Sequence, residues 1–367
     1  MLLNINEKLP RLIFVYIRGE HHYALIRPLA LRNPDYHFYL HSNFVTEDQF
    51  RKSELHGIAN VHFVQDFRRI VYKLNLFGAF ITTDAHAVHA HFYSLKLIRL
   101  FRRMGTPVYE LQHGMFQIGL HYYDLPHDEY VGDDSLPTTT FADKVLAYYP
   151  PVSRAAPFVT IGYPPYDLGC CRKTQPGEYV LVMSNLHWQT YSHEEKHAFY
   201  YAVMEYARRH EETLFIWRMH PGEAANKACA VIVNGLFALY PELRKRLIFQ
   251  RDSMLLAKTG VEGMVRQAKA VISTVSTVLM DCEIAGKPTA VYACKTNACL
   301  IGMLESKDAA FSNVDELENV MSRGTPFSSG LLRPYDNAAF RMEIENSYKP
   351  SALKQGEWLE LVISEVE

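Results

Sequence analysis

The chain has 367 residues, more than one hydrophobic core usually organises, so two domains are expected. With 48% hydrophobic and 21% charged residues it is globular, and its net charge of −2 excludes a general electrostatic attraction to nucleic acid. No apolar run approaches the ~18 residues of a membrane span. Residues 1–17 lack the basic and cleavage regions of a signal peptide. These features predict a cytoplasmic protein.

The spacing of the cysteines also fits a cytoplasmic protein. They form no C-x-x-C pair, and no histidine stands at zinc spacing from them, which favours reduced, mostly buried thiols. The six are Cys170, Cys171, Cys229, Cys282, Cys294 and Cys299.

In the first half of the chain, strand-like runs alternate with helix-like segments. Short β-branched and aromatic runs are separated by segments such as 45–57 and 91–105, whose apolar residues recur at helical spacing. This alternation predicts βαβ units and a parallel sheet covered on both faces. The predicted strands span residues 11–17, 36–42, 60–64, 79–84, 107–112 and 144–149.

A segment rich in proline and glycine, 157–179, interrupts the alternation and predicts a link between domains. The alternation then resumes, with helices expected within 192–210 and from Pro221 onward. Strands are predicted at 179–185, 213–219, 246–250, 270–274 and 289–293. We therefore expect an α/β fold with two Rossmann-like domains facing a central cleft. The expected parts are residues 1–165, residues 166–335, and a helical segment, 336–367, able to pack back on the first domain.

The stretch YELQHGMFQ (109–117) places polar residues where a predicted strand ends. Glycine after an apolar run marks a tight turn, which puts Gln112 and His113 at the strand tip. Ligands bind beyond the carboxyl ends of strands in open α/β sheets, and a histidine there can accept a proton near neutral pH. His113 is thus a candidate base and Gln112 a candidate cleft residue. The alternative is a histidine bonded to a neighbouring carbonyl group.

Two carboxylates compete with His113 for the role of base. Asp84, at the tip of another predicted strand, could orient His113 or act as the base itself. Glu110 is the third candidate, although strand alternation puts it on the face opposite to His113.

Three further segments carry polar residues. RGEHHY (18–23) follows the first strand, so Gly19, Glu20 and His21 are expected in a loop facing the cleft; the alternative is an exposed loop. TTDAHAVHAHF (82–92) lacks the H-E-x-x-H spacing of zinc hydrolases, and no metal site is expected. The basic helix within 95–105 could rest on anionic lipid at the inner membrane face; a solvated helix face is the alternative.

In FIWRMHPGEAA (215–225), His220 follows a buried-looking strand. Pro221 suits the first helical position, and Glu223 lies in the first turn, where a carboxylate opposes the helix dipole favourably. A helix N-terminus beside a basic side chain binds anions, and phosphate is the usual one. The alternative is that His220 only caps its helix.

AVISTVSTVLMDCEIAGKP (270–288) forms a second polar corner. A buried strand runs into four hydroxyl residues and then a short helix that ends at Gly286. Hydroxyls and free N–H groups at a helix start can hold phosphate, and Asp281 could accept from a ribose or base; many such residues, however, cap helices that bind nothing. The hydroxyl residues are Ser273, Thr274, Ser276 and Thr277.

The chain contains neither G-x-G-x-x-G nor G-x-x-x-x-G-K-[ST], which argues against a dinucleotide oxidoreductase and a P-loop NTPase.

Four short matches, in order, give the chain a family resemblance. LQHG (111–114), VTIGYPPYD (159–167), RMHP (218–221) and STVSTVLMDCEIAGKP (273–288) resemble the Q/W-H-G turn, domain link, HP motif and S-T-x-x-x-[DE] segment of bacterial GT-B glycosyltransferases. These enzymes assemble capsule, lipopolysaccharide and teichoic acid. The group includes Kdo transferases, sialyltransferases and CDP-glycerol glycerophosphotransferases.

The resemblance implies a nucleotide-activated donor in the second domain, a glycan or lipid-linked acceptor in the first, and transfer without metal or cofactor. His113 would be the base. The donor phosphate would meet Arg218, His220, Ser273, Ser276 and Thr277, with Asp281 as the acidic position that follows them. RMHP departs from K-P-H-P, and TVSTVLMD lacks D-Y-S-S, which favours a sugar donor over CDP-glycerol; the HP motif favours CMP-linked Kdo or sialic acid.

Two other functions fit the same architecture. A sugar-nucleotide epimerase would consume its substrate without an acceptor. A non-catalytic scaffold would bind nucleotide or carbohydrate without turnover, because fold alone does not decide function.

Overall fold

The computed structural model describes residues 11–86, 91–115, 117, 140–150, 157–166, 177–186, 191–249 and 254–347. Predictions that concern His89, Cys170, Cys171 and residues after 347 lie outside this part of the chain.

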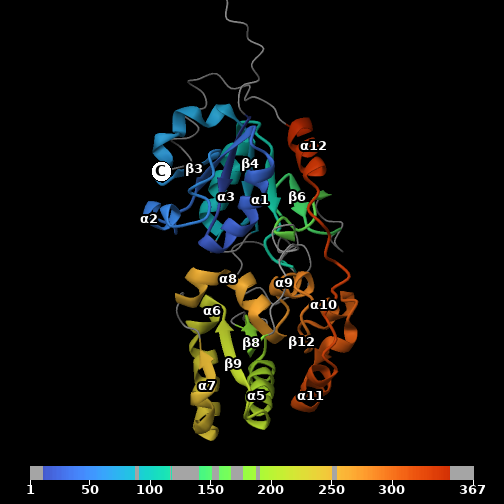
Figure 1. Cartoon of the computed structure of the whole chain (residues 1–367). Helices are drawn as coiled ribbons and strands as arrows, with labels where there is room; N and C mark the ends of the chain where they lie inside the picture. Colours follow the sequence, from blue (N-terminus) through green and yellow to red (C-terminus); the bar gives the residue numbers. More distant parts are fainter. Residues whose placement is uncertain are drawn as a thin grey trace, which may run out of the picture.

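The first domain is built on a parallel sheet with the strand order β3-β2-β1-β4-β5-β6-β7 (Figure 1). The chain winds outward from β1 in one direction and from β4 in the other, so the order reverses between β1 and β4. The strands are β1 (Arg11–Tyr16), β2 (Tyr36–His41), β3 (Val61–Val64), β4 (Phe77–Thr82), β5 (Val108–Leu111), β6 (Lys144–Ala147) and β7 (Phe158–Thr160).

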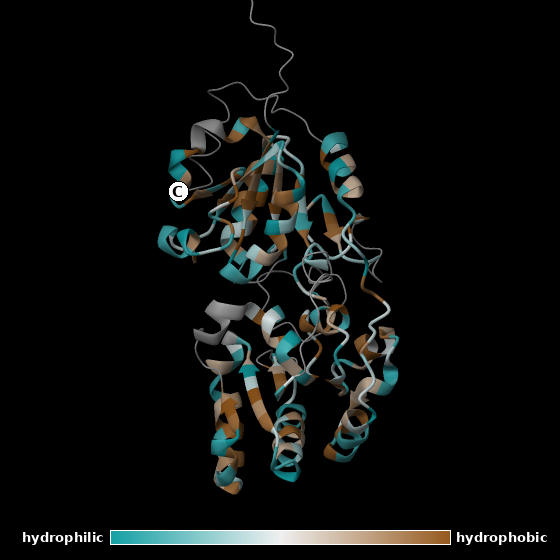
Figure 2. Cartoon of the chain, viewed as in Figure 1, coloured by the Kyte–Doolittle hydropathy of each residue, from teal (hydrophilic) through white to brown (hydrophobic). Residues whose placement is uncertain are grey.

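Both faces of this sheet are buried. Ile13 and Val15 of β1 belong to one core cluster, whereas Phe14 and Tyr16 belong to another, as the two-residue period of a strand requires. Figure 2 shows the strands of this domain largely in hydrophobic colours. The covering helices are α1 (Tyr23–Arg32), α2 (Glu47–Arg51) and α3 (Phe92–Arg103), with the 3-10 helices η1 (Glu20–His22), η2 (Phe67–Arg69) and η3 (Val71–Leu76).

The second domain repeats the arrangement, with a parallel sheet in the order β10-β9-β8-β11-β12-β13. Its strands are β8 (Tyr179–Ser184), β9 (Leu214–Met219), β10 (Leu247–Phe249), β11 (Ala268–Ser273), β12 (Thr289–Tyr292) and β13 (Ala310–Phe311). The order reverses between β8 and β11. The prediction of two Rossmann-like α/β domains is confirmed.

The helices of the second domain follow local signals. Ser192 and Glu195 form a capping box at the start of α5, and Gly286 takes a positive φ of 60° just after α9. The helices are α5 (His193–Arg209), α6 (Pro221–Ala224), α7 (Lys227–Leu239), η5 (Pro241–Lys245), α8 (Met254–Gln267), α9 (Val278–Ile284), α10 (Ala298–Met303), η6 (Lys307–Ala309) and α11 (Val314–Arg323). Within the described residues, no helix is long and apolar enough to span a bilayer.

Two predictions about single elements are wrong. Residues 158–160, assigned to the link, form β7 at the edge of the first sheet. The helix expected from Pro221 stops after four residues, and a separate helix, α7, starts with Asn226 as its cap. Asn226 accepts hydrogen bonds from two backbone N–H groups of α7 and so favours a new helix start there.

The chain passes between the domains twice, and the two passages touch. The backbone N–H of Tyr163 donates to Arg333 O at a distance of 3.0 Å, and the N–H of Asp336 donates to Ile161 O at a distance of 2.8 Å. Between them, Gly162 has a φ of +70° and lies directly against the backbone of Pro334.

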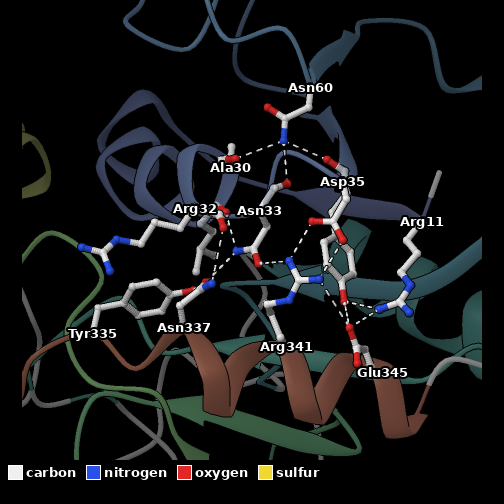
Figure 3. A network of polar contacts seen from close by, with 12 residues as sticks. Arg11, Ala30, Arg32, Asn33, Asp35, Asn60, Tyr335, Asn337, Arg341 and Glu345 are labelled. Atoms are coloured by element: carbon white, nitrogen blue, oxygen red, sulfur yellow. Dashed lines mark hydrogen bonds and ion pairs between the residues drawn. The ribbon is translucent and has the colours of Figure 1, made fainter.

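The second passage leads to α12 (Asn337–Ser347), which lies on the first domain although it follows the second in sequence (Figure 1). Figure 3 shows its polar contacts: Arg341 donates to both carboxylate oxygens of Asp35 at 2.7 Å, and Glu345 pairs with Arg11. Phe340 and Ile344 are fully buried in the core of the first domain. The first domain is thus completed by this late segment.

Candidate functional site

The predicted site residues follow strands at the carboxyl edges of both sheets. In doubly wound sheets a ligand binds at this edge, next to the point where the strand order reverses. In the first domain that point lies between β1 and β4, and in the second between β8 and β11. The loops after these strands, together with those after β5 and β9, therefore define the candidate site.

Gln112 holds the turn after β5 instead of facing a ligand. Its side chain is completely buried. The amide nitrogen donates to Gly114 O and Met115 O at 2.8 and 3.0 Å, and the amide oxygen accepts from the Tyr148 N–H at 2.8 Å. The prediction of Gln112 as a cleft residue is therefore wrong, because the side chain is buried and both its amide nitrogen and its amide oxygen bind backbone groups.

His113 lies at the tip of β5, beside a histidine of the loop after β1. Its ring centroid lies 5.3 Å from that of His22, and its Nδ1 atom is buried with no hydrogen-bond partner in the described part of the chain. Burial lowers the pKa of His113 to about 4, against the opposing effect of Asp84 and Glu110. The imidazole is therefore neutral at pH 7 and can accept a proton.

The two carboxylates predicted as alternative bases are enclosed. Asp84 pairs with His91 Nε2 at 3.1 Å, and Glu110 pairs with His86 Nε2 at 2.6 Å. Burial disfavours the charged form of Asp84, but the hydrogen bond and charge of His91 outweigh it and hold the pKa of Asp84 below its usual range. Neither carboxylate contacts the His113 side chain, so the expectation that Asp84 orients His113 directly is not met.

The histidine-rich segment after β4 was weighed as a metal site. Among the described residues no group of three His, Cys, Asp or Glu side chains is arranged to hold a metal ion. His86 and His91 are instead paired with the two carboxylates.

The loop after β1 brings two histidines to the site. His21 is exposed and His22 is buried, with ring centroids 4.0 Å apart, whereas Glu20 points to solvent. Gly19 has extended backbone with a φ of −155°. Desolvation, followed by the interaction with His220, lowers the pKa of His21 to about 4. His21 and His220, from different domains, therefore lie close enough to influence each other.

Two basic side chains at the end of β9 face this loop. Arg218 is partly buried, which lowers its pKa, and it forms no ion pair or hydrogen bond with any described residue. His220 Nδ1 accepts from the Gly222 N–H at 3.1 Å, so a neutral ring carries its proton on Nε2. Desolvation, followed by Arg218 and Arg18, lowers the pKa of His220 to about 4. Because α6 is only four residues long, the basic character at the end of β9 comes from side chains and not from a helix dipole.

Sequence reasoning did not single out Arg18. Its guanidinium lies 5.6 Å from the Phe44 ring centroid, and its charge lowers the pKa of both His21 and His220. The signal available was its place directly before Gly19 in the first loop, but nothing local distinguishes it from other arginines. Arg18 and Arg218 give the two domains positive charge on facing loops.

The Ser and Thr residues after β11, which were predicted to hold phosphate, take part in hydrogen bonds within the protein, including one to the first domain. Thr277 Oγ1 accepts from the Met115 N–H at 3.0 Å and lies 3.4 Å from His113 O, so two predicted motifs far apart in sequence meet. Ser276 Oγ accepts from the Val278 N–H at 3.2 Å. Ser273 is fully buried and donates to Thr274 O, so its predicted contact with phosphate is wrong.

Asp281 lies against the domain link. Tyr163 donates to its carboxylate at 3.3 Å, and the Tyr163 ring packs edge-on against Tyr148. Burial, followed by the charge of Glu262, raises the pKa of Asp281 to about 7. Its carboxylate therefore contributes to the contact with the domain link, and the predicted bond to a ribose or base stays a prediction.

Glu223 has a larger structural role than the predicted effect on a helix dipole. One carboxylate oxygen accepts from Ser184 Oγ at 2.8 Å and Tyr200 OH at 2.6 Å, and the other accepts from the Leu186 N–H at 3.0 Å. Burial raises the pKa of Glu223. This network fixes the end of β8 beside His220, whose N–H donates to Ser184 O.

The lowered pKa values predict acid sensitivity. His21, His113 and His220 have folded-state pKa values of about 4, below their ordinary 6.5, so between these values the unfolded chain binds more protons. The free energy of unfolding should therefore fall as pH drops from 6.5 to 4. Urea denaturation at pH 7.5 and pH 5 measures this, with His21→Gln expected to reduce the pH dependence and the exposed His56→Gln to leave it unchanged. Equal pH dependence in all three proteins would contradict the prediction.

Comparison with known proteins gives structural likeness only. No family model matches the chain, and no curated protein sequence matches it. The S. aureus MnaA–UDP co-structure is similar with a TM-score of 0.57 at 11% identity, covering 94% of this chain and 100% of that one. UDP-GlcNAc 2-epimerase from Neisseria meningitidis bound to UDP-GlcNAc has a TM-score of 0.55 at 10% identity, covering 97% and 99%.

Phytolacca americana UGT2, complexed with UDP-2fluoro-glucose and pterostilbene, is more distant. Its TM-score is 0.46 at 12% identity, with 97% and 99% of the two chains covered. The predicted likeness to Kdo transferases and sialyltransferases therefore stays a prediction. The likeness with higher TM-scores confirms the fold: two Rossmann-like domains in the GT-B arrangement, which this chain shares with UDP-GlcNAc 2-epimerases.

Proposed function

We propose that the chain is an enzyme that transfers a sugar from a nucleotide-activated donor to an acceptor hydroxyl. The observation that carries the proposal is the approach of two arginines from different domains, Arg18 and Arg218, to His21 and His220, beside the neutral His113.

The basic corner suits donor phosphate. Arg218 has no ion-pair partner among the residues the structure describes, and its partial burial makes the unpaired charge costly. A guanidinium binds phosphate oxygens through charge-assisted hydrogen bonds, and the Nε2–H of a neutral His220 adds a donor. Phosphate bound here would offset the repulsion between the basic loops of the two domains.

His113 suits the acceptor side. In the proposed reaction the acceptor oxygen gives its proton to His113 and forms a bond to the anomeric carbon of the sugar. The bond between that carbon and the phosphate oxygen breaks, and its electron pair stays on the phosphate. Arg218 and His220 stabilise the negative charge that develops there. No metal or cofactor enters this scheme.

The donor nucleotide has two candidates. The HP motif favours a CMP-linked acid sugar of the Kdo or sialic acid type, with a bacterial glycan or glycolipid as the acceptor. The similar solved structures contain UDP or UDP-GlcNAc, which favours UDP. The same structures favour a second candidate function, epimerisation of a UDP-sugar, because the Neisseria protein is a UDP-GlcNAc 2-epimerase.

One experiment separates these functions. The protein is incubated with CMP-N-acetylneuraminate, CMP-Kdo, CDP-glycerol or UDP-GlcNAc, with and without a total glycolipid extract from bacterial envelopes, and the products are followed by ³¹P NMR. Nucleotide release from a sugar donor that requires the extract supports glycosyl transfer. Release of CMP from CDP-glycerol that requires the extract supports glycerophosphate transfer, and conversion of UDP-GlcNAc without the extract supports epimerisation. Binding without either reaction would leave a non-catalytic scaffold.

Arg218→Ala should weaken nucleotide binding. Hydrogen bonds to charged groups contribute about 1.5–3 kcal/mol, so the Kd for UDP or CMP should rise roughly 10- to 100-fold. Isothermal titration calorimetry measures the change. Arg244→Ala is the matched control, because it removes the same charge from an exposed arginine whose guanidinium packs on Phe237. An equal effect of both variants would contradict a specific phosphate contact.

A further inference from the structure

A buried glutamine holds the backbone of the candidate base. Gln117 is 4% exposed, and its Oε1 accepts from the His113 N–H at 3.0 Å. The turn at residues 112–115 is therefore fixed twice: Gln112 binds its carbonyl groups, and Gln117 binds the amide of His113 itself.

Glu110 and His86 set the orientation of that glutamine. Gln117 Nε2 donates to Glu110 Oε1 at 2.5 Å, and the same oxygen lies 2.6 Å from His86 Nε2. The backbone N–H of His113 can only donate, so the amide oxygen of Gln117 must face it and the amide nitrogen faces Glu110. Glu110 is fully buried and His86 is 2% exposed, so neither can touch a substrate in the cleft.

We propose that Gln117, oriented by Glu110 and His86, is a positioning residue that holds His113 in the geometry for proton transfer. The inference rests on the proposed function, in which His113 is the base. It replaces the earlier candidate role of Glu110 as the base with an indirect role. Catalytic groups displaced by about 1 Å lose about 100-fold in rate, so loss of this hydrogen bond should be visible in turnover.

Glu110 has a second effect, carried by its charge. Its carboxylate raises the pKa of His113 and so partly offsets the effect of burial. Glu110→Gln keeps the shape and an acceptor oxygen but removes the charge. The pKa of His113 should then fall further, because the charge that raises it is removed.

Two measurements test the proposal. The first compares kcat, KM and the Kd for UDP in the wild type, Gln117→Ala and Gln117→Met; the second variant retains side-chain volume in case the first does not fold. Asn60→Ala is the matched control, since Asn60 is a buried amide of the same domain that donates to three backbone carbonyl groups. The second measurement titrates ¹⁵N-histidine-labelled wild type and Glu110→Gln by NMR, with the His113 signal assigned from His113→Asn.

The expected result is a kcat lowered about 10- to 100-fold by the Gln117 variants, with an unchanged Kd for UDP. Asn60→Ala should lose stability without this loss of kcat. A kcat equal to wild type in both Gln117 variants, or reduced as much by Asn60→Ala, would overturn the proposal. If the wild type itself shows no turnover, the proposed function fails, and the NMR titration decides alone. A lower His113 pKa in Glu110→Gln then supports the coupling between the two residues, and an unchanged one refutes it.

Discussion

His113→Asn is expected to lower kcat by about 10²- to 10⁴-fold, the usual contribution of a general base. Asparagine preserves the polarity of the turn but cannot take up the acceptor proton. The Kd for nucleotide should be unchanged, because the basic side chains of the second domain remain in place. Steady-state kinetics with the donor identified by the product assay, together with calorimetry, measure both quantities.

His21 provides the sharpest control for this result. It too is neutral at pH 7, since its pKa is lowered to about 4, and it is more exposed than His113. If His21→Asn abolished turnover and His113→Asn did not, the assignment of the base would move to His21. With His113 as base, kcat/KM should stay level from pH 7 to pH 5 and fall as pH approaches about 4, where protonation removes the acceptor site.

Gly162→Ala is expected to destabilise the fold by more than about 4 kcal/mol, the range of severe single substitutions. A Cβ atom at this position would lie 1.9 Å from Pro334 O and 2.6 Å from Pro334 C, and the φ of +70° adds strain for any residue with a side chain. Backbone atoms cannot rotate away as a side chain can. The two passages between the domains would have to separate, which should appear in urea denaturation.

Gly105→Ala is the control that measures backbone strain without a steric clash. Gly105 has a similar φ of +75°, but nothing lies within 4 Å of its added Cβ. Its substitution should therefore cost only the conformational strain, about 1–2 kcal/mol. Similar losses from both substitutions would show that the contact between Gly162 and Pro334 adds little.

The sequence was sufficient to predict the repeating βαβ pattern, because nearly every strand is a continuous apolar run. The strand at residues 158–160 was not predicted, because three residues beside a proline-rich segment are too few to show the alternation of a strand. Only their pairing with β6 makes them a strand. His113, Arg218 and His220 could be proposed because each follows or ends a strand. The approach of His113 to His22 and of His220 to His21 could not be predicted, because these contacts join segments far apart in the chain.

Gln112 and Glu223 show the same limit for buried polar residues. The position of Gln112 at a strand tip predicted contact with a ligand. The position of Glu223 in a first helical turn predicted an interaction with the helix dipole. In the structure, Gln112 is fully bonded to its own turn and to Tyr148, and Glu223 is bonded to Ser184 and Tyr200. Whether a polar side chain turns inward depends on partners that only the tertiary structure supplies.

The position of α12 has a consequence for how the protein is made. Glu343 accepts from Lys144 Nζ at 2.8 Å and from Tyr109 OH at 3.1 Å, while Phe340 fills part of the first domain's core. During synthesis, residues 11–160 leave the ribosome long before residues 337–347. The surface of the first domain that α12 covers therefore stays exposed until the entire second sheet has been translated. A nascent chain stalled before α12 should therefore expose an apolar, chaperone-binding face on its older half, and synthesis of α12 would cover it.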